Sequence, residues 1–384
     1  MTLIQRLKKL RIDGKIAFYR ALPLRKNKII MWANSFKQYG DSPKYVTEYL
    51  LQNVPGTFDI VWVFETDRDI PAELPDSVRV VRYFSIGYLK ELHTAKYIIC
   101  NMRTGPAHYW KKRKGQFYIQ TWHSSLRLKK IERDAEDHLP ESYIETCKED
   151  SRRIDLILSG CKFSTEIFRR SFWYDGEILE SGTPRCDVLL SPTDENRKKV
   201  RARYGIPAEE KLALYAPTFR QNRASDFQGL DFNRLRAALE EGGERWTVGA
   251  RLHPNVLSDA ACEGAVPMSD YSDMQELIAA ADLLITDYSS CMFDMAIAGK
   301  PCILYVPDLE EYLEKERGLY FEIGSLPFPT AGNMEELVGV IRRFDRGEYQ
   351  KRLGSFLDSI GSFEDGNAAK RVCEYILRQE ATKR

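Results

Sequence analysis

Residues 274–308 constrain the fold more than any other stretch, because they alternate two helix signals with two strand signals. Apolar residues recur at i, i+3, i+4 and i+7 from Met274, which is a helical spacing, and short apolar runs then have the length of buried strands. Gly299 and Pro301 are typical of a helix end. The predicted elements are helices over 274–281 and 291–298 and strands over 283–286 and 302–306. This order is typical of a doubly wound parallel sheet.

A serine-rich turn, Asp287-Tyr288-Ser289-Ser290, joins the first of these strands to the second helix. Ser289 and Ser290 are residue types that favour the N-cap of a helix. Free amides of residues 289–291 would point beyond the carboxyl end of the strand, and together with the helix dipole they would form an anion site. The alternative is an ordinary loop whose serines only cap the helix.

Length and composition predict a two-domain protein that stays in the cytoplasm. The 384 residues exceed the size at which a single hydrophobic core keeps growing. The sequence contains neither an apolar run of about 18 residues, as a membrane span requires, nor a signal peptide. Its eight cysteines include no C-x-x-C pair, so we expect reduced thiols rather than a disulfide framework or a metal site.

Residues 1–27 form a basic segment that we expect to lie on an anionic membrane surface. Residues 1–28 hold nine Lys or Arg against one Asp, whereas the rest of the chain is net acidic. Leu3, Leu7 and Leu10 recur among these cations at helical spacing, a pattern typical of helices at a lipid interface. The alternative is a solvated basic helix that packs on its own domain.

Alternating strand and helix signals predict two α/β domains, 28–192 and 193–384, with the last helix packing back on the first domain. The expected strands are 28–32, 59–64, 78–81, 97–100, 117–121 and 156–159, then 212–216, 246–250, 265–268, 283–286 and 302–306. Two such domains bind ligands in the cleft at the carboxyl ends of their strands. Polar residues just beyond the predicted strands are therefore candidate site residues: His123, Thr218, Arg220, Arg251, His253, Asp287, Ser289 and Ser290.

Two of the five histidines stand out because each follows a predicted strand, one in each domain. They are His123 and His253. A histidine with a near-neutral pKa can take a hydroxyl proton or donate to a phosphate oxygen, so both are candidate catalytic residues. A satisfied core imidazole is the alternative. We expect His93, His108 and His138, which lie in helical or charged stretches, to be structural or solvated.

Several enzyme signatures are absent. The sequence has no Walker loop, no G-x-G-x-x-G and no G-x-S-x-G, so it gives no support to Walker-type nucleotide hydrolysis, dinucleotide redox chemistry or a hydrolase triad. The Asp-Arg-Asp triplet at 67–69 resembles an acidic metal-binding pair, but such triplets are common in turns, and no metal site is predicted. We expect the basic cluster Lys111, Lys112, Arg113 and Lys114 to contact an acceptor or a membrane. No nucleic-acid partner is expected, because no nucleic-acid module is visible.

Four linked motifs resemble those of the CDP-glycerol glycerophosphotransferase family, bacterial enzymes that prime and polymerise teichoic acids and related cell-surface polymers. The similarity covers about residues 28–330, and the motifs occur in the family's order. They are Thr121-Trp122-His123 with Leu128-Lys129-Lys130-Ile131, Tyr215-Ala216-Pro217-Thr218-Phe219-Arg220, Arg251-x-His253-Pro254, and Ile285-Thr286-Asp287-Tyr288-Ser289-Ser290 with Phe293-Asp294, Lys300-Pro301 and Tyr305.

The resemblance implies a GT-B architecture, in which two Rossmann-like domains face a central cleft and the C-terminal one binds the donor nucleotide. It also implies transfer of glycerol phosphate from CDP-glycerol to an acceptor hydroxyl with release of CMP, without a cofactor; a divalent metal requirement stays open. His123 would be the general base. The donor would be held by His253, Ser289, Ser290, Asp287, Thr218, Arg220 and Arg251, and the acceptor or membrane by Lys129, Lys130 and the cluster at 111–114.

The acceptor is expected to be polymeric or lipid-linked at the inner face of the membrane, so the protein would be peripheral there; a homo-oligomer stays open. Two alternatives remain: a transferase of the same fold that uses CDP-ribitol or a nucleotide sugar, and a non-catalytic membrane-associated partner of a polymer-assembly complex. The family usually has Gly directly after the histidine, where this chain has Ser124. If that Gly serves a positive φ or a close backbone approach, the serine adds strain of about 1 kcal/mol and narrows the site.

Overall fold

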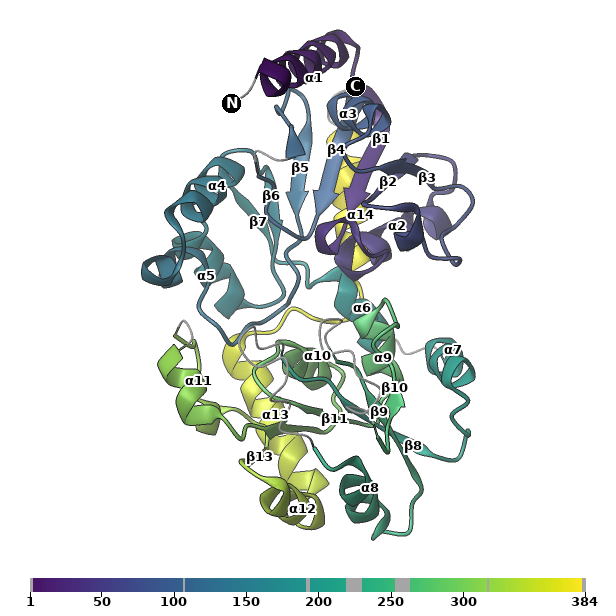
Figure 1. Cartoon of the computed structure of the whole chain (residues 1–384), viewed down its shortest axis with the longest axis vertical. Coiled ribbons are helices and arrows are strands. Elements are labelled where there is room, and N and C mark those ends of the chain that lie inside the picture. Colours follow the sequence, from purple (N-terminus) through teal and green to yellow (C-terminus); the bar gives the residue numbers. More distant parts are fainter. Residues whose placement is uncertain are drawn as a thin grey trace.

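Two parallel β-sheets, one above the other and each wrapped by helices, make up the molecule (Figure 1). The structure, a computed structural model, describes residues 3–105, 108–190, 194–218, 230–252, 263–315 and 318–381. The predicted α/β fold class, with two doubly wound sheets in a GT-B-like arrangement, is confirmed.

The first sheet has seven strands in the order β3-β2-β1-β4-β5-β6-β7, all parallel. Its strands are β1 Arg25–Trp32, β2 Asp59–Phe64, β3 Arg79–Arg82, β4 Ala95–Cys100, β5 Phe117–Gln120, β6 Leu156–Leu158 and β7 Glu177–Leu179. Six of them match predicted strands. The seventh, β7, escaped prediction because it is only three residues long and none of them is fully buried, so it has no apolar run.

The second sheet has six strands in the order β10-β9-β8-β11-β12-β13, again all parallel. They are β8 Lys211–Tyr215, β9 Trp246–Ala250, β10 Val266–Pro267, β11 Leu283–Thr286, β12 Cys302–Tyr305 and β13 Thr330–Ala331. The five predicted strands are present. The two-residue β13 is too short to leave a periodic signal.

The helices cover both faces of each sheet (Figure 1). They are α1 Leu3–Ala21, α2 Asp41–Asn53, α3 Ile86–Thr94, α4 Glu141–Ser151, α5 Lys162–Ser171, α6 Asp187–Leu190, α7 Asp194–Tyr204, α8 Phe232–Glu240, α9 Met274–Ala280, α10 Cys291–Ile297, α11 Leu309–Lys315, α12 Met334–Arg342, α13 Arg346–Ile360 and α14 Ala368–Ala381. The helices predicted within 274–308 are α9 and α10, and Gly299 beyond α10 has a φ of 66°.

The central strand β1 shows why the sequences of the strands are unbroken apolar runs. Ile30 and Trp32 belong to the core that contains α3, while Ile29 and Met31 belong to the core that contains α2 and α14. Because successive side chains of a strand point to opposite faces, a sheet covered on both faces needs apolar residues at every position. The seven cysteines in the described part of the chain are buried and free.

The C-terminal helix belongs spatially to the first sheet. The chain leaves the second sheet at the end of α13, where Gly361 has a φ of 61°, and α14 then packs on the first sheet (Figure 1, yellow). Val372, Cys373 and Ile376 of α14 are buried in the same core as α2. Two connections therefore cross between the sheets, one after β7 and one after α13.

An ionic cluster between α2 and α9 joins the two domains beside the cleft. Lys44 Nζ lies 2.6 Å from Asp273 Oδ2 and 2.6 Å from Glu276 Oε1, and all three side chains are buried. The Tyr45 hydroxyl donates to the same Asp273 oxygen at 2.9 Å. A buried ion pair with several hydrogen bonds requires close geometry, so this cluster fixes α2 against the second domain.

Backbone hydrogen bonds form a second contact between the domains. Lys130 N donates to Gly318 O at 2.8 Å, and Tyr320 N donates to Leu128 O at 2.7 Å. The segment after His123 is thereby paired with the segment after α11. Together with the α2–α9 cluster, this pairing holds the domains across the cleft.

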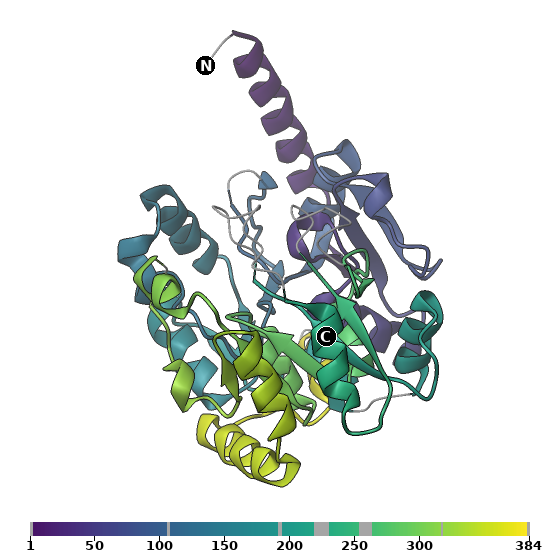
Figure 2. The same ribbon diagram turned by 60° about the horizontal axis from the view of Figure 1, so that its bottom comes forward.

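The N-terminal helix α1 projects from the first domain (Figure 2). Its residue Ile16 is 2% exposed and packs in the core that contains α3, whereas Leu10 and Phe18 are 67% and 62% exposed. One face of α1 is thus packed on its own domain, and another carries unburied apolar side chains. Within the described residues, no helix is long and apolar enough to cross a bilayer.

Candidate active site

Two neighbouring cavities lie between the domains, at the carboxyl ends of the strands. His123, Pro217 and Ser289 line both cavities. The first chamber, about 460 Å³, is the one lined by Arg185 and Arg251. The second chamber, about 530 Å³, is the one lined by Arg127, Lys129 and Ser290 among others. His123 therefore stands where the two chambers meet.

The orientation of His123 is fixed by a backbone carbonyl. Its Nδ1 lies 3.1 Å from Asn101 O, and because a carbonyl oxygen only accepts, Nδ1 carries the hydrogen. The lone pair is then on Nε2. Asn101 follows β4 and is itself held by Asn34, whose amide N donates to Asn101 Oδ1 at 3.0 Å. An imidazole in this tautomer can accept a proton through Nε2.

The protein around the cleft keeps His123 neutral. The side chain is open to solvent along the cleft, but protein surrounds it on the other sides. This desolvation lowers the pKa of His123 below its ordinary value. The hydrogen bond to Asn101 O and the charge of Asp41 raise the pKa in part, while the nearby cations Arg185 and Arg127 lower it. A neutral imidazole is the form that a general base requires.

The residue before His123 has a strained backbone. Trp122 has a φ of 53°, a left-handed conformation that is unfavourable for a bulky side chain. Its ring lies tilted against the His123 ring with centroids 4.2 Å apart and packs edge-on against Phe172. Ser124 has no positive φ and is 4% exposed. Ser124 therefore carries no strain from a positive φ, because the left-handed conformation falls two residues earlier, at Trp122.

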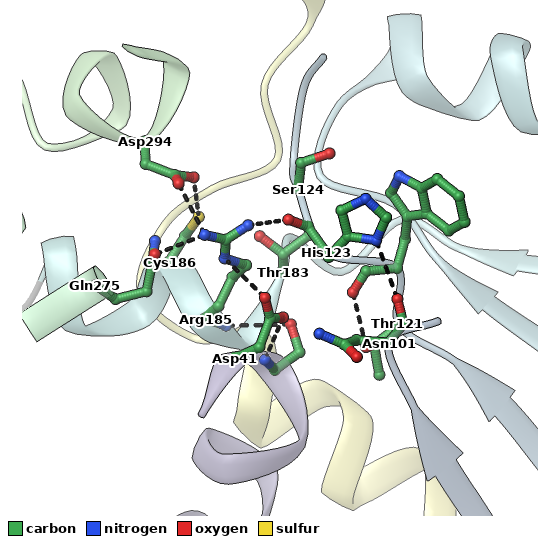
Figure 3. Close-up of polar contacts among 12 residues, drawn as sticks. Asp41, Asn101, Thr121, His123, Ser124, Thr183, Arg185, Cys186, Gln275 and Asp294 are labelled. Atoms are coloured by element: carbon green, nitrogen blue, oxygen red, sulfur yellow. Dashed lines mark hydrogen bonds and ion pairs between the residues drawn. The ribbon is translucent and has the colours of Figure 1, made fainter. Parts of the chain in front are cut away.

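A buried arginine ties His123 to both domains (Figure 3). Arg185 comes from the short 3₁₀ turn Pro184–Cys186 after β7, and its Nη1 donates to His123 O. Its Nη2 donates to Gln275 Oε1 at 2.6 Å and to Asp294 Oδ2 at 2.9 Å. Burial lowers the pKa of Arg185, but Asp294 and Asp41 outweigh that effect and raise it. Arg185 is thus a permanently charged link between the histidine loop and the second domain.

The serine-rich turn of the second domain forms the facing wall of the cleft. Ser289 lines both chambers and Ser290 lines the second. The Ser290 side chain makes no N-cap hydrogen bond. Ser289 Oγ accepts from Cys291 N in a long contact of 3.5 Å, so capping remains an alternative for Ser289. Asp287 has another contact: its Oδ1 accepts from Thr218 N at 2.8 Å and from Thr218 Oγ1 at 2.6 Å. These hydrogen bonds therefore join the loop after β8, which contains Thr218, to the loop after β11, which contains Asp287.

Arg251 supplies a cation to the first chamber. Its Nη1 and Nη2 lie 3.4 Å from Met274 Sδ and Tyr271 O, which are neutral partners. Burial lowers the pKa of Arg251. Within the described residues no carboxylate lies at ion-pair distance from it, so its charge is available to an anion in the chamber.

The predicted acceptor and membrane residues divide into two groups. Lys129 lines the second chamber, and Lys130 lies next to it in the segment paired with Gly318. The other group, Lys111, Lys112, Arg113 and Lys114, precedes β5 and lies at the amino ends of the strands of the first sheet, near α1 and away from the cleft (Figure 1).

The cluster before β5 is only partly available to a ligand. Lys112 pairs with Asp155, and Arg113 Nη1 donates to His93 O at 2.7 Å. Lys111 and Lys114 are exposed, and Lys111 Nζ lies 3.6 Å from Asp13 of α1. The cluster thus extends the basic surface of α1 rather than the cleft.

Two predicted site residues, Arg220 and His253, lie outside the described residues. Among the residues described, no cluster of His, Cys, Asp and Glu has the arrangement of a metal site. Of the histidines expected to be structural or solvated, His93 is buried and bonded to Leu89 O at 2.8 Å, and His138 is exposed.

Sequence reasoning did not single out Asn101, which orients His123, or Arg185 and Arg127, which line the two chambers. Asn101 directly follows β4, so the rule that selected the other strand ends could have found it. Arg185 lies in a short turn and Arg127 lies four residues beyond His123, and neither has a local pattern that marks it. Their surroundings come from distant parts of the chain.

Two facing α/β domains, with an imidazole between two cation-lined chambers at the carboxyl ends of their strands, form a GT-B-like architecture. The profile of the family described as CDP-glycerol:poly(glycerophosphate) glycerophosphotransferase matches residues 16–378. The chain belongs to this family. It is a CDP-glycerol glycerophosphotransferase-family enzyme of teichoic acid synthesis, which confirms the expectation drawn from the motifs.

Similar proteins share this assignment. The chain is 31% identical over 372 residues to a teichoic acid poly(glycerol phosphate) polymerase of Bacillus spizizenii, covering 93% of each chain. It is 30% identical to a teichoic acid glycerol-phosphate transferase of Staphylococcus aureus, covering 97% of this chain and 99% of that one. It spans about half the length of a polymerase of Bacillus subtilis. A solved structure of the wall teichoic acid polymerase TagF matches with a TM-score of 0.85 at 28% identity, covering 100% of this chain and 99% of that chain.

Proposed function

We propose that the chain adds glycerol phosphate from CDP-glycerol to a terminal hydroxyl of a membrane-linked poly(glycerol phosphate) acceptor. The acceptor oxygen attacks the phosphorus that bears the glycerol, the bond from that phosphorus to the bridging oxygen breaks, and CMP leaves with the bonding electrons. The hydroxyl proton passes to a base. Catalysis of such a phosphoryl transfer is mostly positioning and electrostatic stabilisation.

His123 is the base in this proposal, and one observation carries it. The Nδ1 hydrogen is committed to Asn101 O, so the Nε2 lone pair remains for a proton at the junction of the two chambers. The donor would lie in the first chamber, with its diphosphate near Arg251 and Ser289. The acceptor would enter from the second chamber. His253 and Arg220 are proposed to complete the donor site, as the motifs imply.

The basic N-terminal surface supports attachment to an anionic membrane. The exposed Leu10 and Phe18 of α1 stand among cations such as Arg11 and Lys15. Burying each apolar side chain in the lipid interface contributes roughly 1.5–3 kcal/mol, and each cation near an anionic surface about 1 kcal/mol. A peripheral location at the inner face of the membrane follows from this proposal, and it would bring the enzyme to a lipid-linked acceptor.

The test is release of CMP from CDP-glycerol and from CDP-ribitol, with and without an oligo(glycerol phosphate) acceptor. We expect acceptor-dependent release from CDP-glycerol. His123→Ala should lower kcat by roughly 10²-fold or more, the range that general acid–base groups contribute. His138→Ala is the matched control, because His138 is exposed and lines neither chamber.

Near-wild-type turnover in His123→Ala contradicts the assignment of the base. Faster release from CDP-ribitol than from CDP-glycerol would identify the other donor. Binding of CDP-glycerol without any turnover by the wild-type chain would favour a non-catalytic partner of a polymer-assembly complex.

A further inference from the structure

Two buried arginines near the cleft have their charge balanced by carboxylates. Arg185 Nη2 lies 2.9 Å from Asp294 Oδ2. Arg103 Nη2 lies 3.0 Å from Glu132 Oε2, and its Nη1 lies 3.3 Å from Asp150 Oδ2. In each case the protein itself supplies the counter-ion that a buried guanidinium needs.

Arg127 is different. Its residue surface is only 4% exposed, and within the described residues no carboxylate lies at ion-pair distance. Its Nη2 has two long contacts, 3.4 Å to Ser124 O and 3.3 Å to Ser164 Oγ. Its Nε and Nη1 have no hydrogen-bond partner. The guanidinium lies over the Phe168 ring at 4.4 Å, which fixes its plane.

A buried cation without a counter-ion is unfavourable. Burial lowers the pKa of Arg127 to about 10, still far above neutral pH, so the side chain stays charged. The free energy of burying such a charge is recovered when an anion with several acceptor oxygens pairs with it. A guanidinium matches phosphate well, since it donates through two parallel N–H groups.

The position of Arg127 directs this charge to the second chamber, which it lines together with Lys129. Glu132 also lines the chamber, but its carboxylate is already engaged. One Glu132 oxygen pairs with Arg103 and the other accepts from the Tyr143 hydroxyl at 3.1 Å. The chamber therefore favours an anion.

We propose that the second chamber binds a phosphodiester of the acceptor polymer and that Arg127 is its counter-ion. This inference rests on the proposed function and extends it, because it assigns the acceptor a charged subsite beside His123. The donor already has a cation, Arg251, in the first chamber. With the half-buried Arg251 in the first chamber and the buried Arg127 in the second, the diphosphate of the donor and the polymer phosphate would flank the reacting hydroxyl.

The variants that test this are Arg127→Met, which keeps the length and the packing on Phe168 but removes the charge, and Arg127→Lys, which keeps the charge. Arg133→Met is the matched control, because Arg133 is exposed and lines neither chamber. With an oligo(glycerol phosphate) acceptor, we expect Arg127→Met to raise the KM for acceptor by about 10- to 100-fold, as loss of hydrogen bonds to a charged group predicts.

The KM for CDP-glycerol should stay unchanged in Arg127→Met, and Arg127→Lys should recover part of the acceptor binding. If the KM for CDP-glycerol rises instead, Arg127 serves the donor and the acceptor assignment is overturned. If neither KM changes, the second chamber is no phosphate site.

Thermal unfolding with inorganic phosphate gives a readout that does not require turnover. Phosphate should raise the Tm of the wild-type chain and have a smaller effect on Arg127→Met. Without phosphate, Arg127→Met should be at least as stable as the wild type, because an unpaired buried charge is replaced by an apolar chain of similar length.

A purely structural role predicts the reverse: Arg127→Met would unfold at a lower temperature, and phosphate would stabilise both proteins equally. That result would rule out a phosphate site at Arg127. If the wild-type chain releases no CMP from CDP-glycerol, the proposed function fails, but the comparison with inorganic phosphate still decides whether Arg127 holds a phosphate.

Discussion

His123 shows how few contacts define the reactive group. One hydrogen bond to Asn101 O selects the tautomer, and desolvation in the cleft lowers the pKa. The strain of the loop is stored in Trp122, whose left-handed φ of 53° turns the chain so that the next side chain enters the cleft. Strained residues of this kind cluster at functional sites because surrounding contacts hold them.

Ser124→Gly should not increase the rate of transfer. Ser124 has no positive φ, so Gly would relieve no strain there. Gly would instead make the unfolded chain more flexible and lower the free energy of unfolding by about 0.5–1 kcal/mol. Steady-state CMP release and thermal unfolding of the variant measure both effects. A severalfold rise in kcat would show that the serine narrows the site.

At the scale of elements, the connections between the sheets contain a partly buried acid. Glu364 lies between α13 and α14, and its carboxylate accepts from Thr183 N at 3.0 Å and from Thr183 Oγ1 at 2.8 Å. Burial raises the pKa of Glu364 from 4.5 to about 7, although hydrogen bonds from Ser125 and Thr183 lower it in part. The two chain crossings therefore meet at a group that titrates near neutral pH.

Glu364→Gln should stabilise the protein in a pH-dependent way. Because the pKa is raised in the folded state, the favourable contribution of the protonated acid is complete below pH 4.5 and is lost as the pH rises through about 7. A neutral Gln at position 364 keeps this favourable contribution at every pH. We expect a difference near zero at pH 4.5 that grows to at most about 3 kcal/mol above pH 7.

Unfolding by urea across this pH range measures the difference between Glu364→Gln and the wild type. Glu374→Gln, an exposed position on α14, serves as the control and should show no such trend. An equal effect of Glu364→Gln at pH 5 and pH 8 would contradict the raised pKa.

At the scale of the whole molecule, the basic helix α1 is separate from the cleft and from the interdomain contacts. The domains are joined beside the cleft by Lys44 with Asp273 and by the pairing of Lys130 with Gly318. The helix α1 lies at the end of the first sheet that is away from the cleft (Figure 1). If α1 binds lipid, the cleft at the other end of the sheet stays open to donor and acceptor.

Deleting residues 2–22 should abolish flotation with liposomes that contain anionic phospholipid. Leu10→Ser with Phe18→Ser is the milder variant, because it changes only exposed side chains and leaves Ile16 packed. We expect it to weaken flotation without changing CMP release with a soluble acceptor. Unchanged flotation of the deletion variant rules out α1 as the membrane contact.

Local patterns in the sequence determined most of the fold and the chemical family. Apolar runs of strand length predicted eleven of the strands, because a strand in a doubly covered parallel sheet is apolar at every position. The short β7 and β13 bury too few residues to leave such a signal. His123, Arg251 and Ser289 were found because each directly follows a strand whose carboxyl end must face the cleft.

Only the tertiary structure decided which buried arginines have a carboxylate as counter-ion. Arg185 and Arg127 look alike in sequence, since each is an arginine in a short loop. Folding brings Asp41 and Asp294 to Arg185 from distant segments, and brings no carboxylate to Arg127 within the described residues. A sequence pattern reports neighbours along the chain, whereas the free energy of a buried charge depends on neighbours in space.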